Sequence, residues 1–253
     1  MTNYHYWMER VLSHAGPLRN LVDRIRESYH STFVLESGER LRYRPWKGDK
    51  GAFEEVWEEK LYVTPQPGDI VLDVGAHIGA YSSFALKHAG EKGLVICIEP
   101  DPRNARLLRT NLERIKGSYR VHEVAVSDKP GTMELHHHAL YSATTHTGPR
   151  LENDVDSFSV KVGTIDEICS PLTRLDVLKM DIEGAELKAL KGGAATLRRF
   201  HPHIAMEYHR PEMGSPVEDV IHLLEDLGYR VERKGDIQGI LRAEPRSGGA
   251  TPA

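Results

Sequence analysis

Carboxylic acids stand at the ends of three apolar segments of this sequence. Asp73 closes the first segment, Glu99 the second and Asp181 the third. The carboxyl ends of parallel strands meet at one edge of an open α/β sheet, and such sheets bind their ligands there. We therefore expect the three carboxylates to surround one crevice. A fixed negative charge there suits a ligand that carries an ammonium and a sulfonium group.

Two glycines, Gly75 and Gly79, follow Asp73 and precede an amphipathic helix that we predict from about Ala80 to His88. A dinucleotide site requires the spacing G-x-G-x-x-G, which lets the backbone approach a pyrophosphate. The spacing here is G-x-x-x-G, and a carboxylate two residues before the first glycine would repel a pyrophosphate. The turn therefore disfavours a nicotinamide-dependent oxidoreductase. Glu99 discriminates less, because an acid in that place binds ribose hydroxyls in both classes of site.

Further polar residues fall at the ends of the later segments. Glu183 and Glu186 lie just beyond Asp181, where they could line an acceptor pocket or favour a helix N-terminus. Glu207 and His209 stand two residues apart at the end of a strand, so their side chains point the same way. His209 could remove the proton of an acceptor hydroxyl, or form a structural pair with Glu207.

A divalent cation is a further candidate ligand for Asp181, Glu207 and His209, although no tight ligand spacing requires one. The adjacent histidines His136, His137 and His138 form a second candidate. Three consecutive side chains of an extended segment cannot all face one ion, so a solvent-facing strand end is the better interpretation. Whether the protein needs a metal stays unknown at this stage.

Strands and helices alternate from Asp69 onward, which predicts a mostly parallel sheet with helices on both faces. The link between the strands predicted at 229–232 and 239–241 is too short for a parallel crossover, so we expect one antiparallel strand. The other helices are expected at 1–30, 51–62, 102–115, 187–197 and 216–227, with a helical turn at 164–168. The other strands are expected at 121–126, 132–135, 158–162, 175–180 and 204–206, with a hairpin of 32–35 and 40–43 before them and a long loop at 136–157.

The organisation that we predict is an N-terminal helical and hairpin cap at 1–64, an α/β domain at 65–243 and a flexible tail at 244–253. Apolar residues make up 40% of the sequence and charged residues 28%, as in ordinary globular proteins. The net charge of −4 provides no basic surface of the kind that holds nucleic acid. Two cysteines far apart, and an N-terminus unlike a signal peptide, predict a cytoplasmic protein.

Four segments together resemble one known family. They are V-L-D-V-G-A-H-I-G, I-E-P-D-P, L-K-M-D-I-E-G-A-E followed by L-K-G-G, and P-H-I-A-M-E-Y-H, and the resemblance covers roughly residues 53–209. This pattern is similar to the FkbM family of S-adenosylmethionine-dependent methyltransferases. The resemblance implies the Rossmann-like class I methyltransferase fold, a seven-stranded sheet with one reversed strand. It also implies S-adenosylmethionine as cofactor and O-methylation of hydroxyl groups on sugars, glycans, glycolipids or secondary metabolites.

Within this resemblance, each conspicuous residue receives a role. The methionine part of the cofactor would be held by the turn and the ribose by the second strand end, whereas the adenine would lie at the third strand end. The cofactor residues are then Asp73, Gly75, Ala76, His77, Gly79, Glu99, Pro100, Ala125, Val126, Asp128 and Asp181, and the catalytic candidates are His209, Glu207 and Asp181. His77 departs from the pattern, because the family more often has Asn there; this difference could change a hydrogen bond to the cofactor, but loss of binding does not follow from it.

Two other functions compete with this interpretation. A nucleic-acid methyltransferase could use the same fold, but D-I-E-G stands where such enzymes carry an Asn-Pro-Pro-Tyr-type sequence. A binding protein without catalytic activity is the other alternative. We expect a small-molecule or glycan hydroxyl as acceptor, with no nucleic-acid partner and no transmembrane segment. The sequence identifies neither the acceptor nor the oligomeric state, because the segments that would form the pocket are the least patterned.

Overall fold

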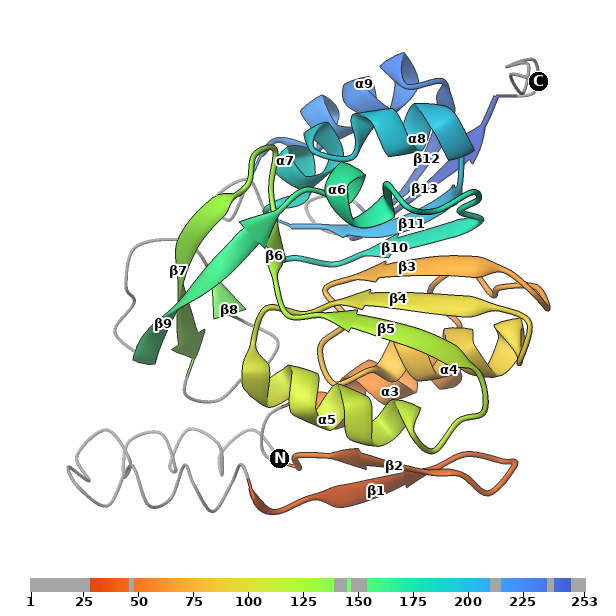
Figure 1. Ribbon diagram of the computed structural model, residues 1–253, viewed down its shortest axis with the longest axis vertical. Helices are drawn as coiled ribbons and strands as arrows, with labels where there is room; N and C mark the ends of the chain where they lie inside the picture. Colours follow the sequence, from red (N-terminus) through yellow and green to blue (C-terminus); the bar gives the residue numbers. More distant parts are fainter. Residues whose placement is uncertain are drawn as a thin grey trace.

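The structure is a computed structural model, and it describes residues 28–45, 48–138, 145–146, 154–209, 215–235 and 239–246. A seven-stranded sheet forms its centre, with the strand order β12-β13-β11-β10-β3-β4-β5 (Figure 1). Its strands are β3 (Ile70–Val74), β4 (Leu94–Ile98), β5 (Ser118–His122), β10 (Val177–Met180), β11 (His203–Tyr208), β12 (Tyr229–Lys234) and β13 (Gly239–Pro245). Only β13 runs against both of its neighbours in this sheet, which confirms the predicted class of fold.

Helices cover both faces of the sheet, because alternate side chains of each central strand point to opposite faces. One face packs on α4 (Ala80–Ala89) and α5 (Pro102–Leu112). Helix α3 (Asp49–Trp57) packs on α4, and the hairpin β1 (Ser31–Val34) and β2 (Arg40–Tyr43) packs on α5, so all of them share one hydrophobic cluster. The other face packs on α6 (Ile165–Cys169), α7 (Glu186–Lys191), α8 (Ala194–Phe200) and α9 (Val217–Asp226). Neighbouring residues such as Val71 and Leu72 belong to the two opposite hydrophobic clusters.

A second, four-stranded sheet lies beside the carboxyl ends of the central strands (Figure 1). Its strand order is β6-β9-β7-β8, and its strands are β6 (Ala125–Val126), β7 (Gly131–His138), β8 (Thr145–His146) and β9 (Asp154–Gly163). The chain therefore leaves the main sheet after His122 and joins the second sheet at Ala125. The prediction of one strand over 121–126 is wrong, because β6 pairs with β9 and not with β4.

The prediction of a loop over 136–157 is wrong at both ends. β7 continues through the three histidines and β9 begins at Asp154, since the two strands form one antiparallel ladder. The sequence conceals this ladder because the segment lacks apolar alternation. Residues 139–144 and 147–153 lie outside the described part of the chain, as do residues 1–27, where we expected most of an N-terminal helical segment.

Two smaller differences also have physical causes. The single helix expected through 187–197 is divided into α7 and α8 at Gly192, where an added Cβ would lie 2.0 Å from the Ser127 carbonyl oxygen. Residues 244 and 245 do not belong to the expected tail, because β13 pairs with β12 as far as Pro245, and the rest of that tail from residue 247 lies outside the described part of the chain. The hairpin at 31–43 is confirmed. Among the described residues, we find no helix with the length and apolar content needed to cross a bilayer.

Candidate active site

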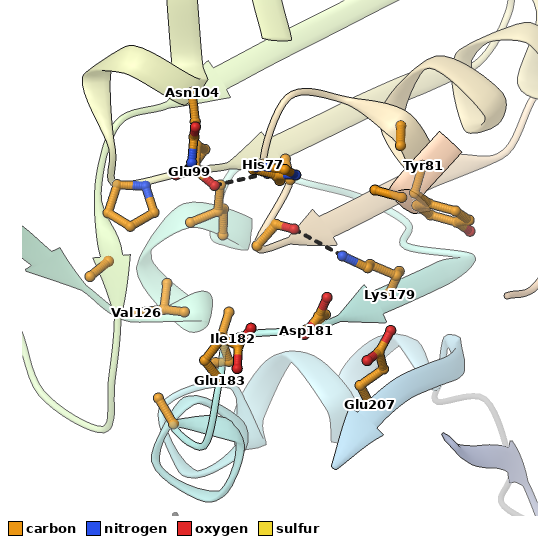
Figure 2. Close-up of a pocket in the computed structure, with 18 of the residues that line it drawn as sticks. His77, Tyr81, Glu99, Asn104, Val126, Lys179, Asp181, Ile182, Glu183 and Glu207 are labelled. Atoms are coloured by element: carbon orange, nitrogen blue, oxygen red, sulfur yellow. Dashed lines mark hydrogen bonds between the residues drawn. The ribbon is translucent and has the colours of Figure 1, made fainter. Parts of the chain in front are cut away.

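A cavity of about 420 Å³ opens beyond the carboxyl ends of β3, β4 and β10. Figure 2 shows Glu99 and Asn104 at one end of this cavity and Asp181, Glu183 and Glu207 at the other. Helix α3 contributes another part of the lining, from Gly51 to Val56. A volume of this size is typical of cavities that enclose a small organic ligand or cofactor.

Most of the predicted cofactor residues meet in this cavity. Those that line it are Gly75, Ala76, His77, Glu99, Pro100, Ala125, Val126 and Asp181, and Glu207 joins them. Asp73, Gly79, Asp128 and His209 are not among the residues that line it. The side chain of Asp128 is exposed and accepts a hydrogen bond from the Ser127 hydroxyl at 3.1 Å, so its placement does not support contact with an adenine.

The apolar end of the cavity combines both sheets. Ile98 comes from β4, Val126 from β6, and Met133 and Leu135 from β7. The contribution of β7 was missed, because the sequence did not reveal that Met133 and Leu135 line the same cavity as the end of β4. This end of the cavity can enclose a flat aromatic group without hydrogen-bonding it.

The two glycines of the turn are required by the protein itself. Gly75 has a φ of 79°, and a Cβ added there would lie 1.8 Å from the Asp181 carbonyl oxygen. Gly79 has a φ of 90°, and its added Cβ would lie 2.7 Å from Leu108. Glycine adopts these angles without steric cost. The turn is therefore tight because it packs on the end of β10 and on α5, whether or not a ligand is bound.

His77 adopts a left-handed backbone conformation, with a φ of 51°. Asn, Asp and His tolerate this region better than other residues that carry a Cβ, so the departure from Asn keeps the turn intact. The backbone N–H of His77 donates to Glu99 Oε2 at 2.8 Å. Its imidazole Nε2 lies 3.3 Å from Oδ1 of the buried Asp49. The histidine thus joins the turn to α3.

Glu99 is held at the tip of β4 by several donors. Its Oε1 accepts from the Asp101 backbone N–H at 3.0 Å and from Asn104 Nδ2 at 3.2 Å. Burial raises the pKa of Glu99 above its ordinary value, and the charge of Asp101 adds to this, whereas His77 opposes it. Since Oε2 accepts only the His77 backbone N–H among the described contacts, it retains a lone pair for a ligand hydroxyl.

Asp73 lies beneath the turn and is fully buried. Its Oδ2 accepts from the Ser82 hydroxyl at 2.5 Å, and its Oδ1 lies 3.4 Å from Lys179 Nζ, an ion-pair distance. Lys179 donates to the Gly75 carbonyl oxygen at 2.8 Å and faces the cavity. Asp73 was expected to contact the ligand directly. The structure instead interposes Lys179, a residue whose one signal in the sequence was a charge within an apolar strand.

Burial alone would lower the pKa of Lys179, but Asp73 and then Asp181 and Glu207 outweigh it, so the pKa is raised and the ammonium stays charged.

An acidic cluster surrounds His209 at the opposite end. The imidazole Nδ1 lies 3.0 Å from Glu186 Oε1, and Nε2 lies 3.4 Å from Glu183 Oε2 and 3.7 Å from Asp181 Oδ1. Burial alone would lower the pKa of His209, but the Glu186 hydrogen bond and the neighbouring carboxylates raise it to about 9. His209 is therefore protonated at neutral pH and forms its hydrogen bond with Glu186, not with Glu207.

Glu183 and Glu207 face the cavity beside this cation. Glu183 has a φ of 54°, an uncommon conformation for a residue with a long side chain. Burial, followed by repulsion from Asp181, raises its pKa to about 7. Glu207 accepts a hydrogen bond from the Tyr62 hydroxyl, and burial raises its pKa as well. Tyr62 was missed because it precedes the segments that carry the motifs.

The three residues considered for a divalent cation also meet here. One ligand atom from each of Asp181, Glu207 and His209 lies within 4.8 Å of the others. A cation could be bound only by a deprotonated imidazole, whereas these carboxylates stabilise the protonated form. The three histidines of β7 follow one another along an extended strand, as the sequence indicated.

Comparison with known proteins places these residues in a family context. Residues 73–231 match the family model described as the methyltransferase FkbM domain. The 2-O-methyltransferase NoeI of Sinorhizobium fredii is 27% identical over 73% of this chain and 83% of its own length. The 31-O-demethyl-FK506 methyltransferase FkbM of Streptomyces tacrolimicus is 29% identical over the same shares of the two chains.

Two further comparisons extend this picture. The hexuronic acid methyltransferase AglP of Haloferax volcanii is 24% identical over 86% of this chain and 85% of its own. A crystal structure of a methyltransferase FkbM from Methylobacillus flagellatus aligns with a TM-score of 0.50 and 19% identity. The alignment covers 76% of this chain and 47% of the Methylobacillus flagellatus chain, so this chain spans about half the length of that protein. This likeness supports the fold.

The buried pair of Asp73 and Lys179 predicts a large loss of stability when one charge is removed. We expect Asp73→Asn to lower the free energy of unfolding by about 3 kcal/mol, because the buried ammonium loses the nearest of its carboxylate partners. The double variant Asp73→Asn/Lys179→Met should recover part of that loss. Urea denaturation followed by circular dichroism measures both. A loss below about 1 kcal/mol in the single variant would mean that the pair is not coupled in this way.

Proposed function

The chain belongs to the FkbM family of methyltransferases, and we propose that it transfers a methyl group from S-adenosylmethionine to a hydroxyl group of a sugar or a secondary metabolite. The names of NoeI and of FkbM from Streptomyces tacrolimicus both describe O-methyltransferases. AglP acts on a hexuronic acid by its name. The names of NoeI and FkbM support an oxygen atom as the methyl acceptor, and the relatives differ in the molecule that is methylated.

One observation supports the proposal: a single cavity contains the buried carboxylate of Glu99 at one end and a cluster of acids at the other. The donor set fits the cofactor, because Glu99 retains an acceptor lone pair and the apolar end can enclose an adenine. When bound, the cofactor supplies a methyl group on a positively charged sulfonium. Asp181 lines the cavity next to Gly75 and would lie beside that charge.

The methionine part of the cofactor would meet the turn at Gly75, Ala76 and His77. Asp73 acts there through Lys179, which fixes the Gly75 carbonyl oxygen. Helix α3 and Tyr62 line the cavity opposite the strand ends, and we propose that residues 1–64 serve as a cap that excludes water. Alignment of the reacting atoms and exclusion of water are the main contributions that a protein makes to such a transfer.

Glu183 is the acceptor's general base in this proposal, in place of His209. A protonated imidazole has no lone pair to take a proton, and His209 is not among the cavity-lining residues. Glu183 lines the cavity and has a pKa of about 7, which is near the optimum for a base at neutral pH. The left-handed backbone of Glu183 directs a carboxylate to this place at the cost of local strain, as is common at functional sites.

His209 would then position the base. Its two ring nitrogens face Glu186 and Glu183, so the imidazolium orients both carboxylates and offsets part of their charge. Glu207 and Asp181 remain candidates for contact with the acceptor and the methyl group. In this proposal the protonated imidazole of His209 provides the positive charge within the acidic cluster. No step of the proposal requires a divalent cation.

The first test measures binding of S-adenosylhomocysteine by calorimetry. The parent protein should bind it, and Glu99→Gln should weaken binding at least about tenfold, the loss expected for a hydrogen bond to a charged group. The exposed Glu113→Gln serves as the control and should leave the affinity unchanged. Binding of NAD in place of S-adenosylhomocysteine would favour an oxidoreductase. Transfer of labelled methyl groups to RNA or DNA, but to no glycan or metabolite, would favour the nucleic-acid alternative.

The charges of the cavity predict which acceptors react. Glu55, Asp181, Glu183 and Glu207 line it, whereas Lys179 contributes the one Lys or Arg side chain among the described lining residues. Two like charges about 6 Å apart repel by about 3 kcal/mol at an effective dielectric constant of about 20. Uncharged sugars should therefore have at least a tenfold higher kcat/KM than the matching uronic acids. Glu55→Gln should reduce this preference, and a preference for uronic acids would contradict the charge argument.

The rate should also depend on pH through Glu183. Below about pH 7 Glu183 is protonated and cannot accept a proton, so kcat/KM should rise as the pH increases through about 7. Glu183→Gln should remove this limb and lower kcat by roughly 10²-fold or more, while the affinity for S-adenosylhomocysteine stays unchanged. A limb near pH 9 that disappears in His209→Gln would restore the histidine as the base.

A further inference from the structure

Glu99 belongs to a closed ring of polar contacts that reaches back to the N-terminal hairpin. The ring passes from Glu99 to the backbone N–H of His77 at 2.8 Å, and from the His77 imidazole to Asp49 at 3.3 Å. Arg44 Nε donates to Asp49 Oδ2 at 2.8 Å, and Arg44 Nη2 donates to Asn104 Oδ1 at 2.7 Å. Asn104 Nδ2 then returns to Glu99 at 3.2 Å.

The burial of the ring shows that these contacts are not incidental. Arg44, Asp49, Glu99 and Asn104 are each 5% exposed or less, although all four are polar or charged. Buried charges are stable only when they are paired and hydrogen-bonded. Burial alone would raise the pKa of Asp49, but His77 and Arg44 outweigh it and hold the pKa well below its ordinary value. Asp49 is therefore a permanent anion that binds both partners.

The ring has the geometry needed to orient Glu99. His77 and Asn104 are donors to the two different oxygens of that carboxylate, so they fix its rotation. Asp49 and Arg44 in turn fix His77 and Asn104 from the far side. Neither Asp49 nor Arg44 lines the cavity, whereas Glu99, His77 and Asn104 do.

We propose that Asp49 and Arg44 are positioning residues for ribose recognition, acting through His77 and Asn104 to aim the Glu99 carboxylate at the ribose hydroxyls. This inference rests on the proposed binding of S-adenosylmethionine. It assigns a part of the cofactor site to residues that precede the matched family domain, which begins at residue 73. No direct contact of Asp49 or Arg44 with the cofactor is required.

The test is a cycle of two ligands and four proteins, with affinities measured by calorimetry. The ligands are S-adenosylhomocysteine and its analogue without the 2′ and 3′ hydroxyls. The proteins are the parent, His77→Asn, Asp49→Asn and the control Lys50→Ala, an exposed neighbour on α3. Asn tolerates the left-handed backbone at position 77 and keeps the N–H to Glu99, so His77→Asn tests the ring even if Asp49→Asn does not fold.

We expect His77→Asn and Asp49→Asn to weaken binding of S-adenosylhomocysteine roughly tenfold, while binding of the analogue changes less than about twofold. Lys50→Ala should change neither. Equal losses for both ligands would mean that the ring has a structural role only, and unchanged binding of S-adenosylhomocysteine would remove the ring from recognition. If the parent protein bound S-adenosylhomocysteine but not more tightly than the analogue, the inference would fail and the proposed function would stand. A parent that bound neither ligand would overturn both.

Discussion

The ammonium of Lys179 is the charge on which the geometry of the cavity depends. It is buried beside a carboxylate of the neighbouring strand, because the register of β10 and β3 places Lys179 opposite Asp73. A buried ammonium must be fully paired, so Lys179 also binds the Gly75 carbonyl oxygen. One side chain thereby fixes the relative height of two strands and the course of the turn between β3 and α4. This arrangement therefore sets the positions of the groups at the rim of the cavity.

Negative charge is in excess around that ammonium, and the excess is concentrated where a cationic ligand would react. Burial, followed by repulsion from Asp181, raises the pKa of Glu183 and that of Glu207, so further positive charge would stabilise the cluster. His209 supplies one fixed positive charge. A polar environment of this kind, prepared before the ligand arrives, stabilises a charge without reorganising when the reaction occurs.

The order of the elements could be predicted from the sequence, and most of the predicted cofactor residues line the cavity, because strand ends and glycine turns follow local rules. Glu99, Asp181 and Glu207 were placed correctly at strand tips, and the short link before Gly239 correctly indicated the reversed strand. The errors come from long-range pairing. No local pattern shows that Lys179 shields Asp73, that β7 supplies Leu135 to the cavity, or that Glu186 rather than Glu207 holds His209. Such contacts join residues that lie far apart in the chain.

The ring around Glu99 has a consequence for how the segment with Arg44 and Asp49 and the cavity respond to each other. A ligand that binds only the folded state stabilises every contact on which its affinity depends, and this relation is reciprocal. The segment with Arg44 and Asp49 would therefore become harder to open when the ribose site is filled. The same segment lies outside the region that carries the recognisable motifs. Substitutions there could tune how tightly the cofactor is retained while every motif residue stays the same.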